Sequence, residues 1–172
     1  MNALVATLQL LVAAAFLSIP VVRARYGATA MGAAEAELRR QGVRPSVLTE
    51  NGMRFDAGGH ETWAPVSFAA MMVAAAGANL LDVSWSPVLT YVLQSLILLV
   101  NCVILYSNLT AVPSVTAAFA RKGDEELARV DVAALLKAAE DGFPAWVWVL
   151  QNARHVVVFG ASIAAIVITA LV

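Results

Sequence analysis

The residues best able to do chemistry in this otherwise apolar chain form one short run, Gln151-Asn152-Ala153-Arg154-His155. Gln151, Arg154 and His155 are spaced i, i+3, i+4, so on a helix they share one face. A guanidinium beside an imidazole and an amide suits a lipid headgroup, a quinone or a partner subunit. The alternative is structural. In a membrane helix, Arg154 lies about six residues in from Trp148, close enough for its side chain to reach the membrane interface beside a hydrogen-bonded His155.

A second set of polar residues, Gln94 and Asn101, lies in another apolar segment and shares a helical stripe with Tyr91 and Leu98. We expect Gln94 and Asn101 to form hydrogen bonds with the helix that carries His155. Such bonds hold membrane helices together at about 0.6 kcal/mol each on average. The candidate ligand- or partner-binding residues are therefore Arg154, His155, Gln151, Asn101 and Gln94.

Motifs for other chemistry are missing from the sequence. It contains no Walker or dinucleotide glycine motif, no HExxH, no CxxC and no nucleophile elbow. The single cysteine, Cys102, lies inside an apolar run, which excludes a disulfide framework and a cysteine-based metal site. We expect no metal, no cofactor and no catalytic residues. A net charge of −1 without a basic patch also makes nucleic acid an unsuitable partner.

Four apolar stretches must position these residues, and they predict the fold class. The stretches cover about 3–22, 65–81, 87–106 and 147–172, in a chain that is 60% hydrophobic. Each is close to the ~20 residues that a helix needs to cross the hydrocarbon core of a bilayer. We therefore expect an all-α integral membrane protein, with one membrane domain over 1–172 built as a four-helix bundle.

The basic residues predict the orientation of the helices. They gather in the 23–64 and 107–146 connections, whereas the 82–86 link has none and neither terminus carries a basic side chain. By the positive-inside rule both long connections are cytoplasmic, and the amino and carboxyl termini face outside. Arginine outnumbers lysine and alanine is abundant, which indicates a bacterial plasma membrane. Trp63 and Trp85 bracket the second stretch at a spacing that fits an aromatic belt at each interface.

The two cytoplasmic connections are expected to be partly ordered. In the first, residues 28–40 predict a short helix, and Asn51-Gly52 predicts a small β-hairpin with a type I′ turn. In the second, the acidic run at 124–126 predicts the start of an amphipathic helix that ends before Gly142 and Pro144. The hairpin is either a docking surface or a plain loop.

Small residues recur every four positions on two of the expected membrane helices. Ala70, Ala74 and Ala78 form one such ridge, and Gly160 and Ala164 form another. Small residues at this spacing let helices approach closely. They predict tight packing, either within the bundle or against another subunit.

The outline resembles the membrane-associated eicosanoid and glutathione metabolism family. Its basis is an outward amino terminus, a cytoplasmic loop of about forty residues, the run at 23–27 (Arg-Ala-Arg-Tyr-Gly) and the run at 63–65 (Trp-Ala-Pro). The resemblance implies a four-helix fold and a small membrane enzyme acting on an apolar substrate. That family's Arg-Ala-x-x-Asn-x-x-Glu motif is missing, since Gly59 and Thr62 occupy the positions of its Asn and Glu. The chain is therefore not assigned to the family.

Two functions stay open at this point, and a third, a homo-oligomeric pore, is disfavoured because no helix carries a charged or polar ring. The favoured one is a non-catalytic accessory or structural subunit of a larger membrane complex. It would pack by its helices against lipid and other subunits or further copies of itself, and would dock partners through the cytoplasmic loops. The alternative is a small membrane enzyme or transporter for a lipid or other apolar molecule, with its site around Arg154. The sequence does not identify the partner, the ligand or the oligomeric state.

Overall fold

The computed structural model describes residues 1–56 and 58–171, and every regular element in this part of the chain is a helix. The helices are α1 (Asn2–Arg40), α2 (Val47–Glu50), α3 (His60–Leu80), α4 (Ser86–Leu109), α5 (Ala111–Lys122), α6 (Glu125–Ala128), α7 (Val132–Asp141) and α8 (Trp146–Ala170). Four of them, α1, α3, α4 and α8, are long and apolar enough to cross a membrane. The predicted all-helical fold with four such helices is confirmed.

The chain divides into two compact units. Unit 1 comprises Met1–Val21, Gly59–Leu105 and Trp148–Val172, and unit 2 comprises Val22–Gly58 and Tyr106–Val147. Each unit has its own hydrophobic core.

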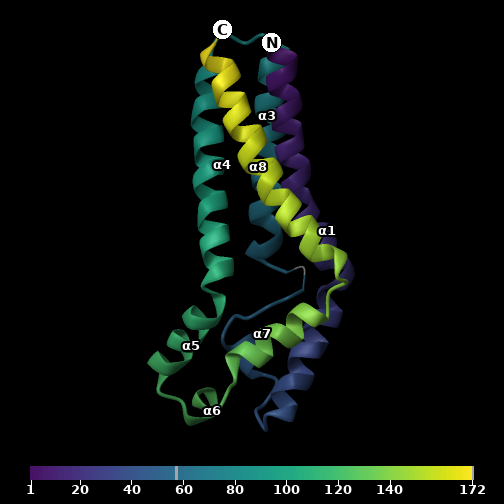
Figure 1. The fold of residues 1–172 in the computed structure, drawn as a ribbon, viewed down its shortest axis with the longest axis vertical. Coiled ribbons are helices and arrows are strands. Elements are labelled where there is room, and N and C mark those ends of the chain that lie inside the picture. Colours follow the sequence, from purple (N-terminus) through teal and green to yellow (C-terminus); the bar gives the residue numbers. More distant parts are fainter. Residues whose placement is uncertain (57, 172) are drawn as a thin grey trace. The chain divides into compact units, whose positions relative to one another are not determined.

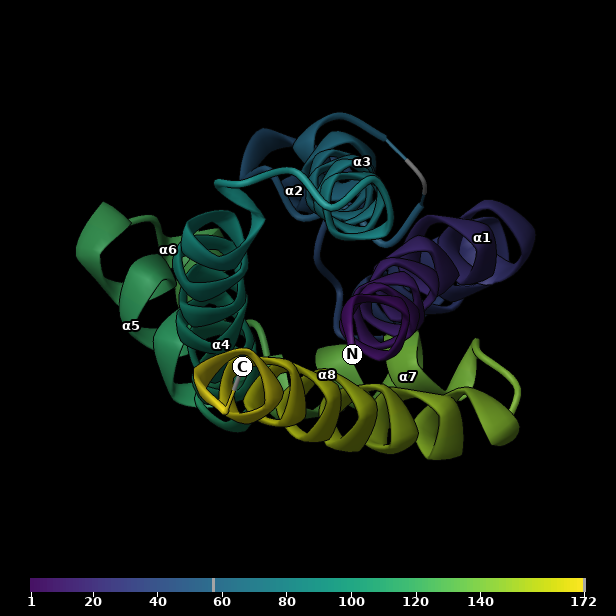
Figure 2. The same ribbon diagram turned by 90° about the horizontal axis from the view of Figure 1, so that it is seen from above.

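Unit 1 is built from the first half of α1 together with α3, α4 and α8, which surround a common core (Figures 1 and 2). All four helices contribute to it, with Val12 and Phe16 from α1, Met72 from α3, Ile97 from α4 and Val158 from α8. The start of α1, the link between α3 and α4, and the end of α8 lie at the same end of the unit (Figure 1). Four segments that alternate in direction place both ends of the unit on the same side.

The outward surface of unit 1 is apolar and its interior is partly polar. Large exposed side chains include Leu4, Val73, Val88, Leu99 and Val156. The buried set, in contrast, contains polar residues from every helix of the unit: Gln9, Asn79, Ser86, Thr90, Gln94, Asn101, His155 and Ser162. This distribution is the reverse of a water-soluble bundle, in which polar side chains cover the surface.

Three of the five residues in the small-residue ridges face away from the core of unit 1, whereas Ala78 is buried. Ala70, Ala74 and Gly160 are exposed, and a Cβ added at Gly160 would meet no atom within 4 Å. Buried positions on the same helices are instead taken by Ala75 and Ala161, among others. Of the two kinds of packing that the ridges predict, packing inside the bundle does not occur at these three residues.

Helix α1 extends beyond its apolar stretch, and its second half belongs to unit 2. The helix continues through Arg23 and Arg25 to Arg40 without interruption, whereas the sequence predicts one helix to residue 22 and a separate one from 28. Charged residues end an apolar run, but arginine and alanine are good helix formers, so the backbone stays helical. The helix ends at Gly42, where the amide of Val43 donates to Leu38 O over 2.9 Å and Gly42 adopts φ 73°. This is a Schellman motif.

The expected hairpin at Asn51-Gly52 is replaced by a helix end. Val47 and Leu48 form part of α2 and are buried in the core of unit 2, and no strand occurs in the described part of the chain. Gly52 has the expected positive φ of 68°, but Asn51 has φ −101°, whereas a type I′ turn needs positive values at both positions. The amide of Met53 donates to Leu48 O over 2.8 Å, so Gly52 closes a second Schellman motif.

The predicted amphipathic helix of the second connection is divided into two. The Asp124 side chain accepts from the Glu126 amide at the start of α6, as the acidic run predicts. A second cap, Asp131, accepts from the Ala134 amide and starts α7. Because each cap begins a new helix, the backbone turns between them and buries both Leu127 and Leu135 in the core of unit 2.

Ion pairs connect distant segments of unit 2. Arg44 contacts Glu126 at 2.7 Å, and the Arg44 amide also donates to that carboxylate. These hydrogen bonds hold the pKa of Glu126 below its usual range. The Arg40 guanidinium, with help from Gln41, lowers the pKa of Glu37 to about 2. Both carboxylates are therefore stabilised in their charged form in the folded unit.

Candidate functional site

The interior of unit 1 brings together three of the five residues predicted for a site. Asn101 on α4 and His155 on α8 are both buried, and His155 Nδ1 lies 2.8 Å from Asn101 Oδ1. Gln94 lies two turns from Asn101 on the same face of α4 and is fully buried. The expected hydrogen bond to the helix of His155 is confirmed for Asn101. Within the described part of the chain, Gln94 has no such bond.

The other two predicted residues are placed differently. Gln151 and Arg154 lie on α8 at intermediate exposure, whereas His155 is buried. The three residues lie on neighbouring positions of α8, but His155 is more deeply buried than Gln151 and Arg154. A ligand role for Gln151 and Arg154 stays a prediction.

A layer of three hydrogen-bonded residues occupies the interior nearer the end of unit 1 that holds the start of α1. The Asn79 side-chain amide on α3 donates to Gln9 Oε1 of α1 over 3.1 Å and to Thr90 Oγ1 of α4 over 3.0 Å. Gln9 Nε2 also donates to Thr90 Oγ1 over 3.2 Å. All three side chains are buried, so the layer joins three helices through satisfied polar groups.

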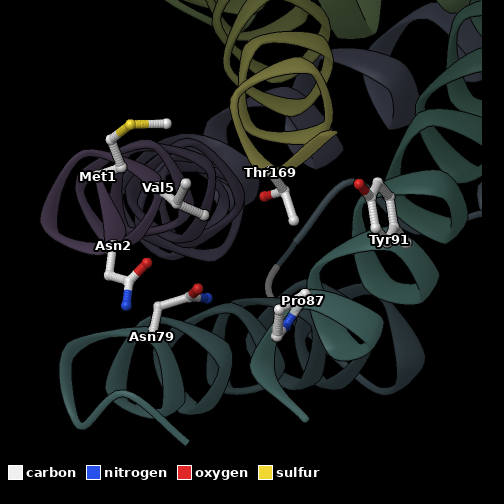
Figure 3. Close-up of a pocket in the computed structure, with 7 residues that line it drawn as sticks. All are labelled: Met1, Asn2, Val5, Asn79, Pro87, Tyr91 and Thr169. Atoms are coloured by element: carbon white, nitrogen blue, oxygen red, sulfur yellow. The ribbon is translucent and has the colours of Figure 1, made fainter. Parts of the chain in front are cut away.

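Asn79 also lines a pocket of about 300 Å³ at that end of unit 1. Figure 3 shows its seven lining residues, which come from α1, α3, α4 and α8 and from Met1: Met1, Asn2, Val5, Asn79, Pro87, Tyr91 and Thr169. Asn2 at its rim donates to Asp82 Oδ1 over 2.7 Å. Asp82 adopts φ 52°, which ends α3 in the way that glycine ends α1.

Several of these interior residues are not among the sequence predictions. Gln9, Asn79, Thr90 and Ser162 are each surrounded by apolar neighbours in the sequence, and a lone polar residue in a membrane segment is a weak signal. A stronger signal is a spacing of seven residues between two polar residues of the same helix. Gln94 and Asn101 are seven residues apart, and so are His155 and Ser162, which places each pair on one helix face.

The chemistry of this interior is that of neutral hydrogen-bonding groups. It contains amides, hydroxyls and one imidazole, and no group of three or more metal-ligating side chains occurs in the described residues. Such a set can bind neutral oxygen or nitrogen groups and can join helices. Searches against protein-family models, curated proteins and solved structures found no match for the chain, so its own geometry carries the functional argument.

Proposed function

We propose that the chain is an integral membrane protein whose helices α1, α3, α4 and α8 span a bacterial plasma membrane. The observation that carries this proposal is the reversed surface of unit 1, where leucine and valine side chains are exposed and amides are buried. In water this arrangement would expose a large apolar area, whereas in hydrocarbon it is the stable one. The termini would face outside and both long connections would be cytoplasmic, following the distribution of arginine and lysine.

The orientation can be tested with single cysteines. Cys102 is the natural cysteine and is changed to serine first. Ser84→Cys then marks the short link, and Arg129→Cys marks the second connection. A membrane-impermeant maleimide should label Ser84→Cys in intact cells and Arg129→Cys only after permeabilisation. Labelling in the opposite order would contradict the proposed orientation.

Within the membrane, the role we propose is that of a non-catalytic accessory or structural subunit. Two features of the structure support it. The ridge residues Ala70, Ala74 and Gly160 are exposed, which offers close-packing surfaces to a neighbouring helix. Unit 2 has its own hydrophobic core and a charged exterior, so it can present a defined surface to partners.

Extraction of the tagged protein in a mild detergent, followed by native mass spectrometry, tests this role. We expect the protein to emerge with other membrane subunits or with copies of itself. Gly160→Leu should release them while the protein itself stays folded, because nothing lies within 4 Å of the added Cβ. Val103→Leu is the matched control, since Val103 is exposed on another helix. A stable monomer without partners in the wild type would contradict the proposal.

A second candidate function is a small membrane enzyme or transporter for a lipid or other apolar molecule. The contact between Asn101 and His155 favours it, because it places polar groups inside the bundle close to Arg154 along α8. In this case Arg154 would bind an anionic group of the molecule. Native mass spectrometry of the wild type should then show a bound lipid, and Arg154→Ala should abolish its retention. Unchanged lipid retention in Arg154→Ala would remove this candidate.

A further inference from the structure

Two fully buried glutamines of unit 1 differ sharply in their partners. Gln9 accepts from Asn79 and donates to Thr90, so both ends of its amide are used. Gln94 is equally buried, but neither its Nε2 nor its Oε1 has a partner among the described residues. A buried amide without partners is rare in folded proteins, because it loses its hydrogen bonds to water and gains none. Gln94 therefore calls for a hydrogen-bonding partner from outside the chain.

The other buried side-chain atoms without partners in unit 1 include three from residues at matching heptad positions of α4 and α8. They are Asn101 Nδ2, His155 Nε2 and Ser162 Oγ. Helices α4 and α8 are antiparallel, and the start of α4 lies beside the end of α8 (Figures 1 and 2). Residues that lie the same number of positions before Asn101 and after His155 therefore fall at the same level.

Observations at two levels indicate this register. At one level His155 contacts Asn101. At the other, fourteen residues further along each helix, Pro87 and Thr169 line the same pocket. Gln94 and Ser162 lie midway, seven residues from both levels, and both are fully buried. The register thus places Gln94 and Ser162 at the same level, two helical turns from the Asn101–His155 pair.

The set of unpartnered atoms defines the guest that would fit. Gln94 Nε2 and Asn101 Nδ2 donate, whereas Gln94 Oε1 accepts and Ser162 Oγ does both. With Asn101 Oδ1 as the acceptor, Nδ1 of His155 is the donor, and Nε2 of the neutral imidazole then offers a lone pair and accepts. None of these groups is a carboxylate, ammonium or guanidinium, so they offer no countercharge to an ion. The guest must be neutral and must both donate and accept.

We propose that the interior face of α4 and α8 around Gln94 and Ser162 is a binding site for a neutral hydroxyl group. The hydroxyl belongs either to water or to an uncharged amphiphilic molecule that enters from the bilayer. Buried waters typically make about three hydrogen bonds to polar groups that would otherwise lack partners. This inference rests on the proposed insertion of unit 1 in a membrane and is independent of whether the protein acts as an accessory subunit.

Solid-state NMR can test the site with the full chain in vesicles of phosphatidylcholine and phosphatidylglycerol. The protein carries ¹⁵N in its glutamine and histidine side chains, and magnetisation is transferred from water. The chain has four glutamines, so the Gln94 signal is assigned by its loss in Gln94→Leu. Gln9 is the internal control, because it is as deeply buried but fully partnered.

Two results support the proposal and separate its two sources. Water is the guest if the Gln94 amide receives magnetisation at least severalfold faster than the Gln9 amide. An amphiphile is the guest if Gln94 stays dry and native mass spectrometry from the same vesicles shows a bound mass. That mass must be kept in Gln9→Leu and lost in Gln94→Leu.

The proposal is overturned if Gln94 is as dry as Gln9 and no bound mass depends on Gln94. Ser162→Ala provides a second variant, with a smaller change in volume, in which transfer to Gln94 should fall. Where Gln94→Leu fails to fold, Ser162→Ala supplies both the assignment of the Gln94 signal and the test of whether a bound mass depends on the site.

Discussion

Replacing Asn79 by alanine should destabilise unit 1 more than any exposed substitution. The Asn79 Nδ2 atom lies within hydrogen-bonding distance of three acceptors: Gln9 Oε1 at 3.1 Å, Thr90 Oγ1 at 3.0 Å and the Ala75 carbonyl at 3.0 Å. An amide nitrogen has two hydrogens, so about two full bonds are lost on truncation. The side chain is 3% exposed, which prevents bulk water from replacing them.

The size of the effect follows from these contacts. Two interhelical hydrogen bonds at about 0.6–1 kcal/mol each contribute roughly 1–2 kcal/mol. Gln9 Oε1 then loses its donor, and a buried acceptor without a partner costs a further ~1–3 kcal/mol. The Ala75 carbonyl lies within α3 and adds little. We expect Asn79→Ala to lower the free energy of unfolding by about 2–5 kcal/mol.

The assay is equilibrium unfolding in mixed micelles at increasing dodecyl sulfate mole fraction, followed by far-ultraviolet circular dichroism. Asn152→Ala is the matched control, since Asn152 is exposed on α8 and its change should stay within about 0.5 kcal/mol. Gln9→Leu combined with Asn79→Ala should cost less than the sum of the single changes, because the two side chains share a hydrogen bond. A change below about 0.5 kcal/mol for Asn79→Ala, or strict additivity of the pair, would refute this reasoning.

Two further predictions concern unit 2. A Cβ added at Gly27 would lie 2.5 Å from Phe55 O, so Gly27→Ala should destabilise unit 2 in thermal melts. The control is Gly32→Ala on the same helix, where the added Cβ meets no atom within 4 Å and the change should be neutral or stabilising by up to about 1 kcal/mol. Equal melting temperatures for the two variants would contradict the close approach of Gly27 to Phe55. Glu37 has a pKa of about 2 in the folded unit, below its ordinary value of 4.5, so its charged form stabilises unit 2 above pH 4.5 and this contribution disappears as the pH falls towards 2. The difference in melting temperature between wild type and Glu37→Gln should therefore shrink over that interval, and a difference that does not vary with pH would exclude the ion pair with Arg40 as its cause.

Much of the fold was predictable because it depends on the length and apolarity of short segments. The four apolar stretches correspond to α1, α3, α4 and α8, since a backbone in hydrocarbon must satisfy its own hydrogen bonds. The start of a helix at Asp124 and the positive φ of Gly52 were also predictable, because both depend on the chemistry of a few neighbouring residues. What Gly52 closes was not predictable locally. A hairpin turn and a helix end both use a glycine with positive φ, and only the burial of Val47 and Leu48 in the core decides between them.

The interior site divides in the same way. The sequence by itself determined which residues are polar within apolar segments and that Gln94 and Asn101 share a helix face, because helical periodicity is a local property. Only the tertiary structure decided that Asn101 meets His155, that Gln9 joins Asn79 and Thr90, and that Gln94 is left without a partner in the described chain. These outcomes depend on the rotation and register of one helix against another. Register is set by the packing of many side chains from all four helices at once, and no single segment contains that information.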